Sequence, residues 1–405
     1  MSTTAPTDIP ATGAWRQGDD PGERQFADLG TVLLASGDQL PVTLAYETFG
    51  TLNAARDNAV LVLHALTGES HCADGPSGPG WWSEVIGPGK AIDTNRYFVL
   101  APNILGGCQG STGPASIAPD GKEWGPRFPK VTARDQVLAE SLLADQLGIE
   151  TFALVIGASM GGHRALEWAI SRPQRVARLA VIASGARTTA DQIGFAHTQL
   201  LAITSDPNFA DGNYYDRAPG QGPWRGLALA RRIAHLSYRT AGELDGRFGR
   251  LAQRGEEPLD GGRFSVQSYL DHHGEKLARR FDANSYITIT NAMLTHDVGR
   301  DRGGVRAALA QIAATTLVVA VDSDRLFGAA ESDLLAEAIP HALPLAEITS
   351  PYGHDAFLIE HDQMSAHLRT LLAAPAGCCT RETTADTCLP HYHRPHCALG
   401  VGQSA

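Results

Sequence analysis

A serine in a glycine-rich pentapeptide is the feature of this sequence best suited to covalent chemistry. Residues 157–161 read Gly-Ala-Ser-Met-Gly, a G-x-S-x-G pattern with Ser159 at its centre. An apolar run at 152–156 precedes the pentapeptide, and a helix-compatible run follows it from His163. Small residues let a serine sit on a sharp strand-to-helix turn, where the helix N-terminus directs N–H groups toward a developing oxyanion. The bare pentapeptide could be a simple tight turn, but its flanking elements predict that Ser159 is a nucleophile.

A nucleophilic serine needs a general base and an acid that orients the base. On a strand–turn–helix scaffold these partners follow the serine in the order acid, then histidine, each on a loop after a strand. The loop after the predicted strand at 315–321 offers two acids, Asp322 and Asp324. Asp324 lies further out on the loop and suits the orienting role better. Of the 15 histidines, His354 stands in a Gly-containing loop directly after the last predicted strand, so it is the predicted base.

The elements around these residues follow the pattern of a mostly parallel sheet covered by helices. Several apolar runs lack the polar alternation of a half-exposed strand, as expected for strands buried on both faces. They lie at 58–64, 97–102, 152–156, 179–184, 315–321 and 346–349. Two earlier runs, at 31–36 and 42–49, predict an antiparallel hairpin. Helices are predicted at 131–148, after the pentapeptide, and at 331–339.

The domain organisation predicted is one large α/β core with a helical insertion. Residues 27–187 and 303–374 form the predicted core, and residues 188–302 have a helical pattern with Gly and Pro breaks. A long helical segment between two sheet strands is best interpreted as a lid over the C-terminal edge of the sheet. The composition of residues 1–26 predicts a loose leader, and residues 375–405 are predicted to be a disordered tail.

Two further loops bear on the chemistry. The strand at 58–64 ends in Ala65-Leu66-Thr67-Gly68, where this type of fold carries the other half of its oxyanion hole, although a plain loop is the alternative. Residues 103–114 are rich in glycine but lack the pattern G-x-x-x-x-G-K-[ST]. The second loop is therefore interpreted as structural rather than phosphate-binding.

Composition bounds the class of protein. The chain has 405 residues, 43% hydrophobic and 19% charged, as in soluble globular proteins. Its net charge of −11 argues against nucleic acid or an anionic membrane as the main partner, because both need a basic face. No run approaches the roughly 20 apolar residues of a membrane span, and the first residues lack the layout of a signal peptide. We therefore expect a cytoplasmic enzyme.

The six cysteines do not predict a disulfide framework in a chain of this length. Four of them lie in the C-terminal tail, at 378, 379, 388 and 397, together with three histidines. This spacing could bind zinc or another soft metal, but it matches no regular C-x₂-C pattern, so a disordered extension is the preferred interpretation. The predicted serine chemistry needs no metal.

A series of long motifs runs through the chain in order. They are Ala65-Leu66-Thr67-Gly68, residues 80–90, residues 103–114, Gly-Ala-Ser-Met-Gly-Gly at 157–162, residues 281–286, residues 296–300, residues 322–327 and residues 352–358. Together they resemble the homoserine O-acetyltransferases of the α/β-hydrolase superfamily, over roughly residues 27–372. The resemblance implies an α/β-hydrolase fold and transfer of an acetyl group from acetyl-CoA to the hydroxyl of L-homoserine in methionine biosynthesis. It also implies ping-pong chemistry through an acyl-serine, a homodimer, and no bound cofactor besides acetyl-CoA as co-substrate.

The resemblance also implies roles for individual residues. The family's catalytic triad falls on Ser159, Asp324 and His354, and its oxyanion hole falls on the backbone N–H groups of Leu66 and Met160. Its homoserine contacts fall on Arg231, Tyr238 and Asp355, whose charges suit the carboxylate and the ammonium of an amino acid. For Arg231 the alternative is a solvated helix face, because Arg232 and Arg239 stand nearby.

Other functions stay open on the sequence alone. An esterase of the same fold also passes through an acyl-serine, with water as acceptor. Related transferases acylate L-serine or use succinyl-CoA, and one or two pocket side chains could decide between these substrates. A non-catalytic binding protein is disfavoured because Ser159, Asp324 and His354 are all present. Gly328 departs from the family pattern, which usually has proline there, and its effect on the loop carrying Asp324 is an open question.

Overall fold

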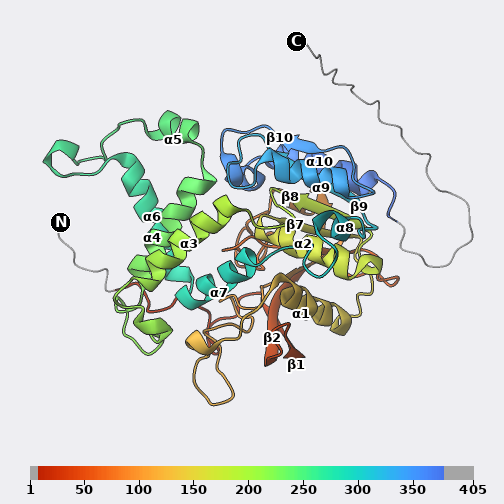
Figure 1. Ribbon diagram of the computed structural model, residues 1–405, viewed down its shortest axis with the longest axis horizontal. Helices are drawn as coiled ribbons and strands as arrows, with labels where there is room; N and C mark the ends of the chain where they lie inside the picture. Colours follow the sequence, from red (N-terminus) through yellow and green to blue (C-terminus); the bar gives the residue numbers. More distant parts are fainter. Residues whose placement is uncertain (1–7, 378–405) are drawn as a thin grey trace, which may run out of the picture.

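The computed structural model describes residues 8–377, and its centre is a twisted sheet of eight strands (Figure 1). The strands lie in the order β1-β2-β6-β3-β7-β8-β9-β10, with β1 and β2 antiparallel at one edge and parallel pairing from β6 onward. Their bounds are β1 Gln25–Leu33, β2 Gln39–Phe49, β3 Ala59–Leu63, β6 Phe98–Pro102, β7 Leu154–Ala158, β8 Arg178–Ile182, β9 Thr315–Val321 and β10 Ala346–Ile348. Two short strands, β4 Ile86–Gly87 and β5 Ile92–Asp93, pair separately.

The central strands are buried on both faces, as their apolar sequences predict. Every residue of β3 and β7 is buried. Side chains alternate across the sheet, so Leu61 and Val155 join one apolar cluster while Val60 and Ile156 join the other. Helices of the core that contribute to these clusters are α1 Ala133–Gln146, α2 Met160–Ser171, α8 Val305–Leu309, α9 Ala329–Ala338 and α10 His361–Ala373.

A helical insertion separates β8 from β9. Its helices are α3 Ala190–Thr204, α4 Trp224–Tyr238, α5 Ala241–Phe248, α6 Ser265–Arg280 and α7 Ala283–Leu294. They form a group beside the sheet that runs from yellow-green to teal in Figure 1, with α4 packed between α3 and α6. A buried hydrogen bond of 2.6 Å from the Tyr286 hydroxyl to Gln199 ties α7 to α3. Buried side chains of the insertion, such as Ile203 and Tyr286, belong to the same apolar cluster as Leu61 and Val155, so the insertion packs onto the sheet domain.

The N-terminal segment differs from the sequence-based expectation. Residues 8–24 are not a loose leader: Ile9 is fully buried, and its carbonyl accepts a hydrogen bond from Gly220 N–H. Gly13 N–H donates to the carbonyl of Phe281, and Trp15 N–H donates to that of Cys108. The expectation from composition is wrong here because these backbone partners are far away in the chain. The first strand likewise begins at Gln25, earlier than predicted, and continues through an irregularity between Asp28 and Thr31.

The C-terminal end of the described chain is also anchored. Gly377 N–H donates to the carbonyl of Ala177, and Thr315 Oγ1 donates to that of Pro375. The cysteines and histidines proposed as a possible metal-binding tail, from residue 378 onward, lie outside the described residues. Within residues 8–377, no helix is both long and apolar enough to cross a lipid bilayer.

Candidate active site

Ser159 occupies a strained turn between β7 and α2. Its backbone has φ 55° and ψ −127°, a conformation that costs a non-glycine residue free energy and is often found at functional sites. The turn is possible because its neighbours are glycines. A Cβ atom on Gly157 would lie 2.0 Å from the carbonyl oxygen of Gly161, and one on Gly161 would lie 2.0 Å from that of Leu63. The G-x-S-x-G pattern thus reflects the close approach of α2 to the sheet.

The structure brings together Ser159 from the turn after β7, Asp324 from the loop after β9, and His354 from the short 3-10 helix Gly353–Leu358 that follows β10. His354 Nε2 lies 2.9 Å from Ser159 Oγ, and His354 Nδ1 lies 2.7 Å from Asp324 Oδ2. The second oxygen, Asp324 Oδ1, accepts hydrogen bonds from the N–H groups of Leu326 and Phe327. These two donors fix the carboxylate, which in turn fixes the imidazole with its proton on Nδ1 and its lone pair toward the serine.

The competing acid has a different place. Asp322 is exposed, and its Oδ1 accepts a hydrogen bond from Ser350 N–H. Of the two aspartates, only the buried one contacts the imidazole. That residue is Asp324.

The electrostatics favour protonation of His354 at higher pH than usual. Burial of the imidazole opposes its charged form, but the Asp324 carboxylate offsets this by charge and by hydrogen bonding. Asp355 and Glu331 act in the same direction, and the result is a pKa of His354 above its ordinary value. A base with a raised pKa takes a proton from serine more readily once it is in its neutral form.

The predicted oxyanion donors, Leu66 and Met160, lie on either side of the elbow. Met160 is the first residue of α2, and Leu66 follows β3 in the loop that α2 touches. Within the described chain, neither backbone N–H donates a hydrogen bond, so both are available to a ligand. The loop is held by His64, whose Nδ1 donates to the carbonyl of Ala65 while Nε2 accepts from Ile104 N–H. Burial, aided by nearby arginines, lowers the pKa of His64 to about 3, so it stays neutral.

A basic pocket of about 250 Å³ opens next to His354. It is lined by Arg231, His235, His273, Lys276, Leu277, Arg280, Asp355, Leu358 and Ile359. Burial and the neighbouring Arg231 lower the pKa values of His235 and His273, to about 2 and about 4, so these two rings are neutral. The positive charge of the pocket therefore comes from Arg231, Lys276 and Arg280.

Two of the three predicted amino-acid contacts, Arg231 and Asp355, line this pocket, and the third, Tyr238, packs against Arg231. The guanidinium of Arg231 lies 5.6 Å from the centre of the Tyr238 ring and donates to Thr67 Oγ1 over 3.3 Å. The Tyr238 ring in turn lies 5.6 Å from that of His354. Asp355 Oδ2 is 3.5 Å from Arg239 Nη1. An anion site and a cation site thus flank the imidazole, which suits a zwitterionic amino acid.

Comparison with known proteins adds to this geometry. The sequence matches the family model described as "alpha/beta hydrolase fold" over residues 58–360. A homoserine O-acetyltransferase of Thermobifida fusca (strain YX) is 57% identical over 378 residues, which cover 92% of this chain and 99% of that protein. The chain belongs to the homoserine O-acetyltransferase family.

Solved structures similar to this chain include members of the homoserine O-acetyltransferase family and esterases. The homoserine O-acetyltransferase of Bacillus anthracis has a TM-score of 0.80 at 28% identity, covering 87% of this chain and 98% of that one. Esterase E22 has a TM-score of 0.79 at 28% identity, covering 86% of this chain and 99% of that one. The fold is thus the expected α/β-hydrolase fold, and the backbone alone does not separate transferase from esterase.

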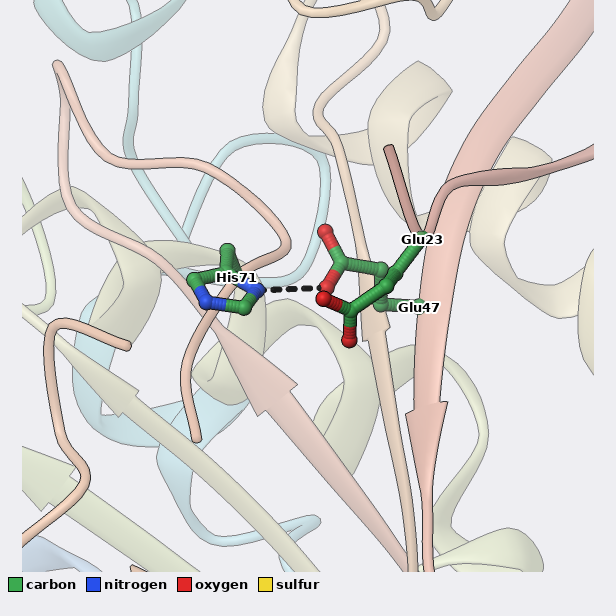
Figure 2. Close-up of side chains that lie close together, drawn as sticks. All are labelled: Glu23, Glu47 and His71. Carbon is green, nitrogen blue, oxygen red and sulfur yellow. Dashed lines mark hydrogen bonds and ion pairs between the residues drawn. The ribbon is translucent and has the colours of Figure 1, made fainter. Parts of the chain in front are cut away.

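A cluster of two carboxylates and a histidine lies close to the oxyanion loop (Figure 2). Oxygen and nitrogen atoms of Glu23, Glu47 and His71 approach within 4.8 Å of one another, a spacing that a metal ion could use. However, His71 Nδ1 contacts Glu47 Oε2 at 2.8 Å and Nε2 contacts the carbonyl oxygen of Gly78 at 3.0 Å. Both partners are acceptors, so the imidazole carries both protons and offers no lone pair to a metal. Although burial opposes its charge, the hydrogen bonds and the two carboxylates raise the pKa of His71.

Sequence reasoning missed several polar residues around the site. Arg239 pairs with Asp355 and also with Glu243, at 2.7 Å. Gln192 and Glu331 contact the loop that carries Asp324. Their local contacts, such as the capping pair of Thr189 and Gln192 and the i,i+4 pair of Arg239 and Glu243, are readable from the sequence. Their contacts to the site come from segments distant in the chain, so no local pattern signals that role.

Proposed function

We propose that the protein is a homoserine O-acetyltransferase that transfers the acetyl group of acetyl-CoA to the hydroxyl of L-homoserine. The observation that carries this proposal is the 57% identity to the Thermobifida fusca homoserine O-acetyltransferase over 99% of that protein's length. The hydrogen-bonded series Ser159–His354–Asp324 supports acyl transfer through a serine ester. Acetyl-CoA is then a co-substrate, the product is an intermediate of methionine biosynthesis, and no further cofactor is required.

The first half-reaction acylates the enzyme. His354 Nε2 accepts the proton of the Ser159 hydroxyl as its oxygen attacks the thioester carbonyl carbon. The negative charge that develops on the carbonyl oxygen is stabilised by the N–H groups of Leu66 and Met160. Collapse breaks the carbon–sulfur bond, and the proton held by His354 passes to the departing sulfur, so free CoA leaves as a thiol. Asp324 stabilises the imidazolium during this step.

The second half-reaction is the reverse chemistry with an alcohol. The neutral His354 accepts the proton of the homoserine hydroxyl while its oxygen attacks the acetyl-serine. Release of Ser159 gives O-acetylhomoserine, and the proton on His354 returns to the serine oxygen. The reaction is ping-pong because CoA leaves before the amino acid attacks.

The pocket beside His354 supplies the proposed recognition of the amino acid. Arg231 pairs with the carboxylate of homoserine, and Asp355 pairs with its ammonium group. Tyr238 packs between Arg231 and His354 and bounds the space for the side chain. Arg239 contacts Asp355 and holds its carboxylate in place, but Arg239 itself does not line the pocket.

We also propose that the helical insertion, residues 188–302, acts as a lid on a core formed by residues 27–187 and 303–374. Supporting this, Arg231 and Arg280 of the insertion reach the oxyanion loop at Thr67.

Four exposed apolar side chains on α3 and α4 favour a homodimer formed through these helices. They are Ile193, Leu201, Leu229 and Leu236. A cytoplasmic location follows from the biosynthetic role.

A second candidate function is ester hydrolysis. The specific observation in its favour is the similarity to esterase E22, at a TM-score of 0.79. In a hydrolase, His354 would activate water instead of the homoserine hydroxyl in the second half-reaction. Two related transferase alternatives differ only in substrate, with L-serine as acceptor or succinyl-CoA as donor.

Product analysis by mass spectrometry tests these alternatives. The purified protein is incubated with L-homoserine or L-serine and with acetyl-CoA or succinyl-CoA, in all four pairings. The proposal predicts O-acetylhomoserine and an equal amount of free CoA. Another pairing that gives the main product would change the pathway but keep the mechanism. Release of CoA without an acylated amino acid would favour the hydrolase, and no release of CoA in any pairing would contradict the proposal.

A further inference from the structure

The loop that carries Asp324 is held from the insertion side by Gln192. This glutamine lies in the first turn of α3 and is almost fully buried. Its side-chain nitrogen donates to the carbonyl oxygen of Leu326 over 2.7 Å and lies 3.2 Å from each carboxylate oxygen of Glu331. Its side-chain oxygen accepts a hydrogen bond from Thr189 N–H, which fixes which way the amide points.

Glu331 holds the same loop from the side of α9. Its Oε2 accepts a hydrogen bond from Gly328 N–H over 3.2 Å. Its other oxygen lies against the loop after β8, where a Cβ atom on Gly185 would be only 2.4 Å away. The family pattern usually has proline at position 328, and proline has no N–H to donate to Glu331. The glycine found here therefore permits a hydrogen bond that proline could not make.

These contacts lead directly to the triad. Leu326 makes two of these hydrogen bonds. Its carbonyl oxygen accepts from Gln192, and its N–H donates to Asp324 Oδ1 over 2.7 Å. The next residue, Phe327, donates to the same oxygen, and its ring lies 5.3 Å from the His354 ring at an interplanar angle of 27°. A shift of residues 326–328 would therefore move the acid and one wall of the imidazole site together.

We propose that Glu331 and Gln192 are positioning residues that together hold the 324–328 loop in register with His354. The proposal rests on the role assigned above to Asp324 and extends it to a pair that touches neither substrate nor the reacting atoms. Neither side chain alone spans the loop: Gln192 binds it at Leu326 and Glu331 binds it at Gly328. Their contact with each other makes the two anchors one unit.

The charge of Glu331 gives this unit a measurable signature. Burial raises the pKa of Glu331 to about 7, and the nearby Asp324 adds to the rise, while hydrogen bonds from Gln192 and Gly328 N–H and the charge of His354 act against it. Ionised Glu331 in turn favours the imidazolium form of His354. Removing that charge should lower the pKa of His354, so the acid limb of the acylation rate should move to lower pH.

The experiment measures acylation of Ser159 with p-nitrophenyl acetate, which reports on the triad whatever the natural substrates are. The variants are Glu331→Gln, Gln192→Leu and the double variant, with Glu337→Gln as matched control. Glu337 lies on the same helix, is exposed and pairs with Arg306 on the surface. Each single variant should lose about 10-fold in acylation rate, the effect of one lost hydrogen bond to a charged group. The double variant should also lose about 10-fold, rather than the roughly 100-fold of independent sites.

The outcomes separate positioning from a general structural role. Slower acylation with an acid limb at lower pH in Glu331→Gln, at an unchanged melting temperature, supports the proposal. Wild-type acylation rates in both single variants overturn it. It is also overturned if the acylation rate falls only as the melting temperature falls, with the acid limb at its wild-type pH. If Glu331→Gln fails to fold, the acylation rate of Gln192→Leu tests the proposal by itself: a loss of about 10-fold supports it, and the wild-type rate overturns it. A protein that shows this signature but makes no O-acetylhomoserine would contradict the proposed function and leave the positioning role intact.

Discussion

Replacing Asp324 by Asn should reverse the hydrogen bond on which the proposed base depends. Two backbone N–H groups, from Leu326 and Phe327, already donate to Oδ1 of Asp324, so the amide oxygen of an asparagine must take that place. Its NH₂ group then faces His354 Nδ1, which has to act as acceptor and leave its proton on Nε2. An imidazole protonated on Nε2 cannot accept the proton of Ser159. We expect kcat to fall about 10⁴-fold, equivalent to about 5 kcal/mol of transition-state stabilisation.

The matched control for this change is Asp322→Asn. Asp322 is exposed, lies two positions away and makes one hydrogen bond to Ser350 N–H, so its replacement should leave kcat within about 2-fold of wild type. Both variants would be assayed for formation of O-acetylhomoserine and for release of p-nitrophenol, with melting temperatures as a check of folding. The reasoning is refuted if Asp324→Asn keeps more than a tenth of wild-type kcat, or if Asp322→Asn is the more damaging change.

Further predictions concern the pocket, the elbow, the acid loop and pH. Arg231→Ala should raise the KM for homoserine far more than that for acetyl-CoA in steady-state assays, and an unchanged homoserine KM would contradict its role. Gly161→Ala should lower kcat about 100-fold, because the added methyl group would push α2 away from the carbonyl oxygen of Leu63. The control is Gly194→Ala, where the methyl group meets no atom and kcat should not change. Gly328→Ala should change the free energy of unfolding by less than about 0.5 kcal/mol in denaturant titrations, because the stiffer unfolded chain offsets the poorer N-cap of α9, and a loss of more than about 1 kcal/mol would contradict this. The raised pKa of His354 should place the acid limb of kcat/KM above pH 6.5, with activity lost as pH falls; a limb below pH 6 would contradict it.

The parts of the fold that could be predicted from sequence are those set by local patterns. Apolar runs without alternation predicted β3 and β7, which are buried on both faces. The position of Ser159 follows from the glycines that its turn requires, and that of His354 from its place after the last strand. These signals are local because a strand end and a tight turn each involve only a few consecutive residues.

What could not be predicted depends on contacts between distant segments. The sequence favoured Asp324 over Asp322, but the two hydrogen bonds that Asp324 accepts from Leu326 and Phe327 N–H could not be predicted from it. The N-terminal segment looks disordered by composition, but Gly13 pairs with Phe281, far along the chain. Gln192 and Glu331 stand 139 positions apart, and no spacing in the sequence shows that they meet. Their part in the site is a proposal from the structure alone.

The separation of the nucleophile from its base along the chain has a consequence for protein synthesis. Ser159 and His354 are 195 positions apart, and the whole helical insertion lies between them. At about 5–20 residues per second, a ribosome needs roughly 10–40 s to make that stretch. Throughout this interval the nascent chain contains the proposed nucleophile but not the proposed base. If the proposed roles hold, a message cut short before the codon for His354 yields a fragment that lacks the base and cannot complete the acyl transfer.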